Sequence, residues 1–118
     1  MKEKISWYKV YDFKKHGAEP QTINSARSVE IENMKICLAR TEEGYFAVHD
    51  RCPHAGARLG MGGWCDKAMV VCPVHRYRYD LKTGRGQQGD YVQTYQVETR
   101  ADGVYIGLPK KVRWWWPF

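Results

Sequence analysis

The chain has 118 residues and a mass of 13.8 kDa, which fits one compact domain and excludes a large catalytic domain beside a separate cofactor domain. Hydrophobic residues make up 43% and charged residues 27%, a composition typical of globular rather than disordered chains. A net charge of +6 is common in proteins that bind nucleic acid, an anionic surface or an acidic protein, but the basic residues are spread along the chain without a dense Lys/Arg block, so the charge is a hint about partners and nothing more. No segment approaches the roughly 18 apolar residues of a membrane span, and the N-terminus has no apolar signal-peptide core. We therefore expect a soluble cytoplasmic protein.

Short strand-like runs separated by turn signals fill the chain, and long helical periodicity is missing. The predicted strands cover residues 5–11, 34–41, 45–49, 68–72, 76–81, 95–100 and 104–108. Turns at residues 42–44 and 101–103 join two pairs of these strands into hairpins. Glycine-rich stretches at 56–63 and 84–89 predict loops. The expected fold is all-β, with about eight to ten short strands.

Two fragments stand out, Cys52-Pro53-His54 and Cys72-Pro73-Val74-His75, with 17 residues between His54 and Cys72. Each fragment offers one thiolate and one imidazole at close spacing, so two opposed turns could hold a metal centre between them. The proline after each cysteine stiffens the backbone. One alternative is coincidence, with small buried cysteines and solvated histidines. Another is a Cys2His2 zinc site, although such sites more often pair cysteine with cysteine and histidine with histidine.

The segments CPHAGARL at 52–59 and CPVHRYRYDLKTG at 72–84 resemble the Rieske iron–sulfur family, and the strand pattern extends this resemblance over almost the whole chain. The resemblance implies stacked antiparallel sheets, with a cluster-binding subdomain at about residues 50–86 inserted into a basal β domain. It also implies one [2Fe–2S] cluster, with Cys52 and Cys72 on the inner iron and His54 and His75 on the outer iron.

The resemblance is to the low-potential members of that family. Ala57 and Val74 occupy the positions of a disulfide found in high-potential members, and Tyr77 replaces a serine that donates to a bridging sulfide. Tyr79 matches a tyrosine that donates to a ligating cysteine sulfur. Arg76 stands where most members have glycine. The residues expected around the cluster are Ala57, Leu59, Arg76, Tyr77 and Tyr79.

The function that this resemblance implies is one-electron transfer from a reductase to a terminal oxygenase, without catalysis by the chain itself. The chain is too short for the mononuclear iron domain of full Rieske oxygenases. An acidic docking surface on the partner is expected, because Arg58 and Arg76 could form a basic rim around the cluster, unless both are simply solvated. Nucleic-acid binding is not expected. The alternatives are a small subunit of a larger oxidoreductase, such as an assimilatory nitrite reductase, and a zinc-stabilised interaction module.

The remaining histidines and cysteines are expected to be structural or solvated: His16, His49, Cys37 and Cys65. The aromatic tail, residues 113–118, contains Trp114, Trp115 and Trp116 and ends at Phe118. It could fold back on the β domain, dock a partner or subunit, or rest at a membrane interface.

Overall fold

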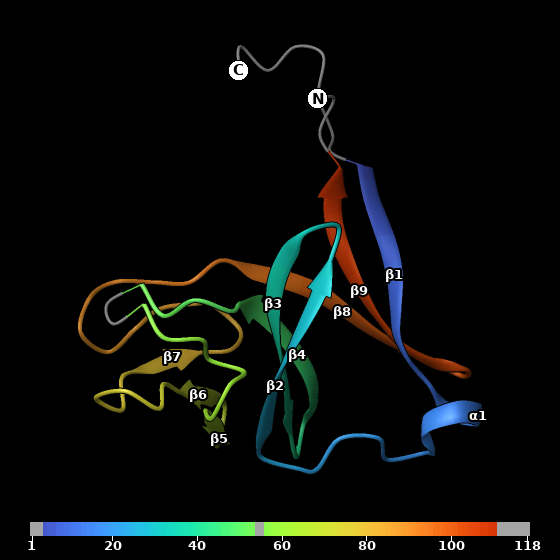
Figure 1. Cartoon of the computed structure of the whole chain (residues 1–118), viewed down its shortest axis with the longest axis horizontal. Helices are drawn as coiled ribbons and strands as arrows, with labels where there is room; N and C mark the ends of the chain where they lie inside the picture. The colour runs from blue at the N-terminus through green and yellow to red at the C-terminus, as the bar shows by residue number, and fades with distance from the viewer. Residues whose placement is uncertain (1–3, 54–55, 111–118) are drawn as a thin grey trace.

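The computed structural model describes residues 4–53 and 56–110, and its regular secondary structure consists almost entirely of antiparallel strands (Figure 1). The elements are β1 (Lys4–Asp12), α1 (Phe13–His16), β2 (Ser25–Ile31), β3 (Met34–Thr41), β4 (Gly44–His49), β5 (Trp64–Asp66), β6 (Met69–Val71), β7 (Arg78–Asp80), β8 (Thr94–Arg100) and β9 (Gly103–Lys110). Their order in the sheet is β1-β9-β8-β4-β3-β2-β5-β6-β7. The all-β prediction is confirmed. The predicted ligand His54 and the aromatic tail lie outside the described residues.

Two strands and one helix were missed by the sequence-based prediction. β2 pairs with β3 along its full length, from Ser25 opposite Arg40 to Ile31 opposite Met34, but the polar residues in its sequence weaken the strand signal. β5 has three residues and is defined by its pairing with β6. The four-residue α1 begins where the Asp12 carboxylate accepts a hydrogen bond from the Lys14 amide, which is a side-chain cap.

The prediction of a strand at 76–81 was wrong at its start, because β7 begins at Arg78. His75 and Arg76 have φ angles of +62° and +58°, in the left-handed region, so the chain is still turning there. In the described ranges, no helix has the length and apolar character needed to cross a bilayer.

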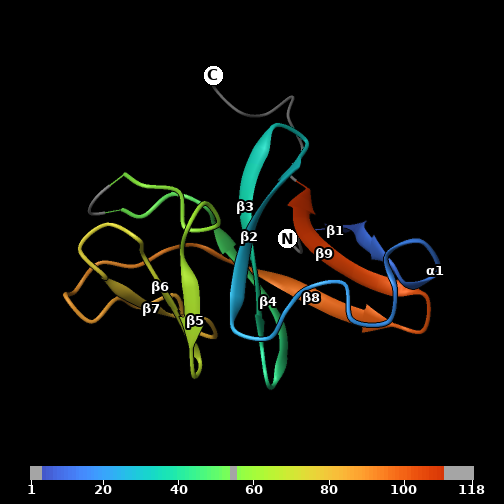
Figure 2. The ribbon, with the colours of Figure 1, turned by 60° about the horizontal axis from the view of Figure 1, so that its bottom comes forward.

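Buried side chains form two hydrophobic cores, which the β3–β4 hairpin separates. Figures 1 and 2 show β1, β8 and β9 on one side of this hairpin and β5, β6 and β7 on the other. The basal core contains Tyr11, Ile31, Ile36, Leu38, Ala47, Val104, Ile106 and Leu108. The loop core contains Cys37, Ala39, Val48, Cys52, Leu59, Cys65, Val70, Cys72, Tyr79, Leu81 and Val92. Because successive residues of β3 enter opposite cores, the strand is buried on both faces.

Candidate metal centre

Two loops in the loop core bring the predicted cysteine ligands together. Cys52 follows β4 and Cys72 follows β6, and both side chains are fully buried. The Cys52 amide donates to the Ala57 carbonyl at 2.8 Å, and the Cys72 amide donates to the Tyr77 carbonyl at 2.8 Å. Each cysteine therefore opens a short loop that its own backbone hydrogen bond closes.

The two thiols lie in the same core, and Cys52 affects the protonation of Cys72. Burial is the main cause that raises the pKa of the Cys72 thiol, and the neighbouring Cys52 thiol raises it further, whereas the Val74 amide acts in the opposite direction. Neither cysteine forms a disulfide. Two adjacent buried sulfurs form a soft donor pair, and metal binding would release their protons.

His75 lies at the exposed end of the second loop, three residues after the buried Cys72. Its ring meets the Tyr77 ring edge-on, with 6.0 Å between the ring centroids. A left-handed conformation at a non-glycine residue costs of order 1–3 kcal/mol and tends to occur where a site requires it. The second loop thus combines a buried sulfur with an imidazole that solvent and a partner protein can reach.

The Tyr79 hydroxyl lies next to the sulfur of Cys52. Its oxygen is 3.2 Å from Cys52 Sγ and 3.1 Å from Asp90 Oδ2. Burial raises the pKa of Tyr79, and hydrogen bonding to Cys52 and then to Asp90 raises it further. The hydroxyl therefore keeps its proton at neutral pH and can donate a hydrogen bond.

The other residues predicted to surround the cluster divide into two groups. Leu59 is fully buried, and the half-buried Ala57 and Tyr77 pack against the loop core. Arg76 is exposed and packs in neither core. The structure thus brings all of them except Arg76 to the same core as the two thiols.

Asp50 is a buried carboxylate that the sequence analysis did not identify. Only 1% of its surface is exposed, and its carboxylate accepts hydrogen bonds from the Ser28 hydroxyl at 2.6 Å, the Gly60 amide at 2.7 Å and Arg58 Nε at 2.8 Å. These contacts connect β2 to the loop that contains Cys52, which is called the first ligand loop below. An aspartate directly after a strand resembles an ordinary turn residue, so no local signal identifies this role.

Glycine at position 60 allows the loop after Cys52 to lie close to the backbone of β2. A Cβ there would collide with the backbone of Arg27 and Ser28, so only glycine fits without a shift of the loop or the strand. The Nε atom of Arg58 is engaged with Asp50, while 40% of the side chain stays exposed. The expectation that Arg58 is either a rim residue or merely solvated is therefore too simple, because it is also a structural contact.

The remaining histidines and cysteines, expected to be structural or solvated, lie outside the predicted ligand set. His16 Nδ1 accepts from the Asp12 amide at 3.0 Å, and His49 lies exposed at the end of β4. Cys65 Sγ lies 3.3 Å from the Ser25 carbonyl oxygen, and Cys37 is fully buried. His16, Cys65 and Cys37 are therefore held within the fold, whereas the His49 side chain faces solvent.

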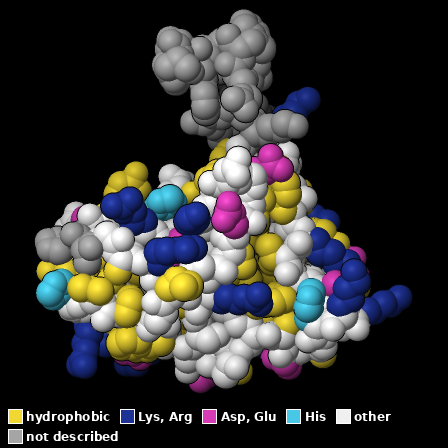
Figure 3. All heavy atoms as spheres, viewed as in Figure 1, with side chains coloured by type: hydrophobic (Ala, Val, Ile, Leu, Met, Phe, Trp, Pro, Cys, Tyr) yellow, Lys and Arg dark blue, Asp and Glu magenta, His cyan; other side chains and the backbone are white. Residues whose placement is uncertain are grey.

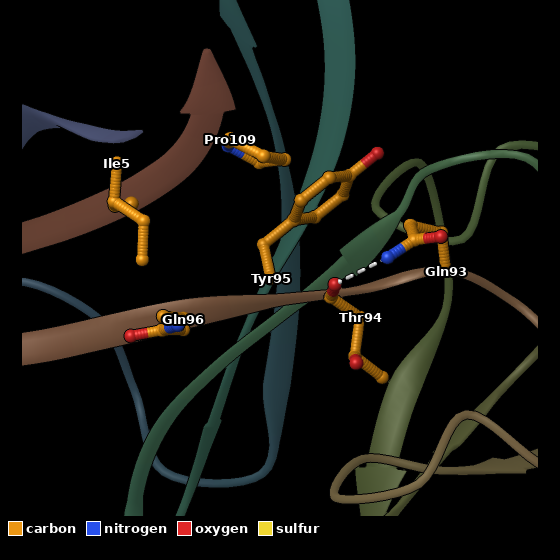
Figure 4. A pocket seen from close by; sticks show the side chains of 7 residues that line it. Ile5, Gln93, Thr94, Tyr95, Gln96 and Pro109 are labelled. Atoms are coloured by element: carbon orange, nitrogen blue, oxygen red, sulfur yellow. Dashed lines mark hydrogen bonds between the residues drawn. The ribbon is translucent and has the colours of Figure 1, made fainter. Parts of the chain in front are cut away.

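A groove of about 450 Å³ lies on the basal side of the molecule, where it is lined by parts of β1, β8 and β9 (Figure 4). Tyr95, Ile5 and Pro109 line it, and Gln93 Nε2 at its edge donates to the Thr94 carbonyl at 2.9 Å. Of the predicted ligands that the structure describes, Cys52, Cys72 and His75, none lines this groove.

The donor set of the loop core fits a [2Fe–2S] cluster of the Rieske type. Within residues 4–53 and 56–110, no three His, Cys, Asp or Glu side chains form a ready site for a single metal ion. Those ranges contribute the Cys52–Cys72 sulfur pair and His75, and the fourth predicted ligand, His54, lies outside them. Two adjacent thiolates on one side and imidazole on the other match the ligands of this cluster type.

Comparison with known proteins identifies the family. The family described as Rieske [2Fe-2S] domain matches residues 6–100, and the chain belongs to it. The predicted resemblance is thus confirmed, and the cofactor is one Rieske-type [2Fe–2S] cluster rather than zinc.

Among its relatives, the chain is similar to ferredoxin subunits of dioxygenases. It is 35% identical over 78 residues to the 3-phenylpropionate/cinnamic acid dioxygenase ferredoxin subunit of Shigella flexneri serotype 5b (strain 8401), covering 64% of this chain and 74% of the relative. The subunit of the same name from Escherichia coli (strain K12) gives the same identity and coverage.

Solved structures at lower identity support the fold alone. The ferredoxin of carbazole 1,9a-dioxygenase from Nocardioides aromaticivorans IC177 superimposes with a TM-score of 0.72 at 20% identity, covering 89% of this chain and 99% of that one. A protein assigned as the small subunit of an NADH-dependent nitrite reductase in Mycobacterium tuberculosis gives 0.77 at 17% identity, covering 92% and 100%.

Proposed function

We propose that the chain is a one-electron carrier, which accepts electrons from a reductase and passes them to a terminal oxygenase without catalysing a reaction itself. The observation that carries this proposal is the 35% identity to dioxygenase ferredoxin subunits. The site supports it, because a buried sulfur pair next to an exposed histidine suits transfer at a protein surface. The bound cluster supplies the reversible one-electron chemistry, and the chain holds the cluster and presents it.

The proposed ligands are Cys52 and Cys72 for the inner iron and His54 and His75 for the outer iron. The full burial of both cysteines supports an inner position, and the exposure of His75 supports an outer one. A thiolate pair can be buried because it neutralises the charge of the iron–sulfide core. An exposed imidazole shortens the distance that an electron travels to a docked partner.

The proposed cluster-binding subdomain spans about residues 50–86, and the packing favours extending it to residue 92. Val92 is buried in the loop core, and its amide donates to the Gly84 carbonyl at 2.8 Å. Asp90 reaches Tyr79 from the same loop. The flanking strands would form the basal β domain.

We propose that the partner docks at the exposed ends of the two ligand loops. The docking face comprises Arg58, Met61, Val74, His75 and Arg76. The loops adjoin each other, since a Cβ on Gly62 would lie 3.5 Å from Pro73 Cβ. Met61 is 63% exposed and Val74 40% exposed, so apolar surface lies beside the two arginines. Such a face suits a partner surface with an apolar centre and acidic side chains.

The basic charge is diffuse over one face of the molecule (Figure 3). Lys and Arg side chains are scattered over the face shown in Figure 3. Local charge at the docking face, rather than the net charge of the chain, is therefore the basis for the expected acidic partner. A cytoplasmic location is proposed for this carrier, because the reducing cytosol keeps cysteine thiols available as cluster ligands.

The test is direct electron transfer. The cluster-loaded protein is reduced, mixed with an oxidised oxygenase component, and followed by the visible absorbance of both proteins. We expect transfer of one electron per chain, with slower transfer at higher salt because acidic and basic surfaces attract each other less. Arg76→Glu should slow the transfer, while the matched change Lys67→Glu outside the docking face should not.

One outcome would favour the alternative function. If the loaded protein transfers no electron to oxygenase components but copurifies in a fixed ratio with a nitrite reductase large subunit, the carrier proposal is wrong. The chain would then be a resident subunit of that enzyme.

A further inference from the structure

The Tyr79 hydroxyl lies between two hydrogen-bond acceptors. Its oxygen is 3.2 Å from Cys52 Sγ and 3.1 Å from Asp90 Oδ2. A tyrosine hydroxyl has one proton to donate. A cysteine bound to iron is a thiolate, and an ionised aspartate also accepts only, so neither neighbour can supply a second proton. The sulfur and the carboxylate therefore compete for the same proton.

Asp90 is held in this position by its own loop. Gln88 Nε2 donates to Asp90 Oδ1 at 2.5 Å, and the Gly86 amide donates to the Asp90 carbonyl at 2.8 Å. Gly86 has no side chain that would keep the loop away, since a Cβ there would lie 2.8 Å from Tyr79 Cε1 and would also collide with the Asp90 carboxylate. The loop thus packs its backbone against the tyrosine ring and directs the carboxylate toward the hydroxyl.

We propose that Asp90 is a positioning residue that lowers the reduction potential of the protein by drawing the Tyr79 hydroxyl proton away from the Cys52 sulfur. A hydrogen bond to a ligand sulfur stabilises the reduced state, which carries more negative charge, and so raises the potential. Sharing the proton with Asp90 weakens that bond. This inference rests on the proposed role of Cys52 as a ligand.

Asp90 could also act through its charge alone, and a double-mutant cycle separates the two effects. The variants are Asp90→Asn, Asp90→Ala, Tyr79→Phe and the double variant Asp90→Asn/Tyr79→Phe. Asp66→Asn is the charge control, because Asp66 lies in the neighbouring β5–β6 hairpin and pairs with Arg78 at 2.6 Å. The midpoint potential of each cluster-loaded protein is measured, together with its iron and sulfide content.

We expect Asp90→Asn and Asp90→Ala to shift the potential upward. The same Asp90→Asn change should shift it by less than half as much when residue 79 is phenylalanine, because the contested proton is then gone. Asp66→Asn should give a smaller shift than Asp90→Asn. Using both Asp90 variants keeps the test valid if one of them loads poorly.

Two results would overturn the proposal. Equal Asp90→Asn shifts with tyrosine and with phenylalanine at position 79 would mean that Asp90 acts through its charge, and no shift in either background would mean that it has no role. Failure of the ligand assignment looks different, because Cys52→Ser would then retain full iron and sulfide.

Discussion

Two consecutive residues of the second ligand loop, His75 and Arg76, adopt left-handed backbone angles that L-amino acids usually avoid. A left-handed backbone angle at a ligand position is disfavoured by the local chain. The surrounding structure therefore has to stabilise this angle. Here the closing hydrogen bond from the Cys72 amide to the Tyr77 carbonyl encloses both strained residues. Arg76, unlike His75, has no proposed ligand role that would require its side chain.

Arg76→Gly should therefore stabilise the protein. Glycine removes a left-handed penalty of about 1–2 kcal/mol but loses more conformational entropy on folding, so we expect a gain of up to about 1 kcal/mol in the free energy of unfolding. Chemical denaturation measures it. Arg76→Ala is the matched control, since it removes the guanidinium but keeps the strain. Equal stability of the glycine and alanine variants would contradict the explanation by strain.

The Cys65 thiol should make stability depend on pH in the alkaline range, because burial raises its pKa from 9.0 to about 11. The unfolded chain then loses this proton at lower pH than the folded chain does. Its contribution to stability is complete below about pH 9 and is lost as pH rises toward about 11. Cys65→Ala should flatten this part of the stability profile, measured as thermal midpoint against pH. An unchanged alkaline slope in the variant would show that other groups cause the loss.

At the scale of elements, the Asp50 carboxylate connects β2 to the first ligand loop through Ser28, Gly60 and Arg58. Because the carboxylate is almost fully buried, its loss leaves three donors without their acceptor or with a weaker one. The loop core and β2 are thus joined by polar contacts as well as by packing.

Asp50→Asn should cost about 2–4 kcal/mol of stability and speed the loss of iron from the loaded protein, since it breaks the ion pair of the buried carboxylate with Arg58 and rearranges the loop. Ser28→Ala is the graded control and should cost about 1 kcal/mol, because only one hydrogen bond is lost. Unfolding free energies and the rate of iron release to a chelator measure both effects. If Asp50→Asn released iron at the rate of the unsubstituted protein, the loop would not depend on this contact.

The sequence predicted those strands in which apolar residues alternate and those joined by clear turn signals. It failed for β2 and β5, because each is defined by the neighbour with which it pairs rather than by its own residues. The paired Cys/His fragments and the family resemblance together predicted a Rieske-type cluster, which the family match confirms, while the individual ligands stay a prediction. Asp50 and Asp90 were missed because their partners, such as Ser28 and Tyr79, are distant in sequence and brought near only by the fold.

At the scale of the whole molecule, the β3–β4 hairpin serves both cores, so the ligand loops depend on the basal sheet. Ile36 and Leu38 face the basal core, while Cys37 and Ala39 face the loop core. Perturbing the hairpin should affect stability and cluster retention together. The proposed cluster site therefore packs, through this hairpin, against the antiparallel strands of the basal core.

The midpoint potential should fall in the lower half of the ~−150 to +300 mV range of Rieske centres. Ala57 and Val74 cannot form a disulfide between the ligand loops, and Asp90 competes for the Tyr79 proton. Voltammetry of the loaded protein at neutral pH measures this value. A potential in the upper half of the range would place the chain with the high-potential members of the family.

The iron and acid-labile sulfide content of the purified protein, combined with its visible spectrum, tests most directly whether the chain holds a Rieske-type cluster on Cys52 and Cys72. We expect two irons and two sulfides per chain and a spectrum that bleaches on one-electron reduction. Both Cys52→Ser and Cys72→Ser should abolish the cluster, because a hydroxyl is a poor replacement for a thiolate ligand. Stoichiometric zinc without sulfide, or full iron and sulfide in either cysteine variant, would contradict the account.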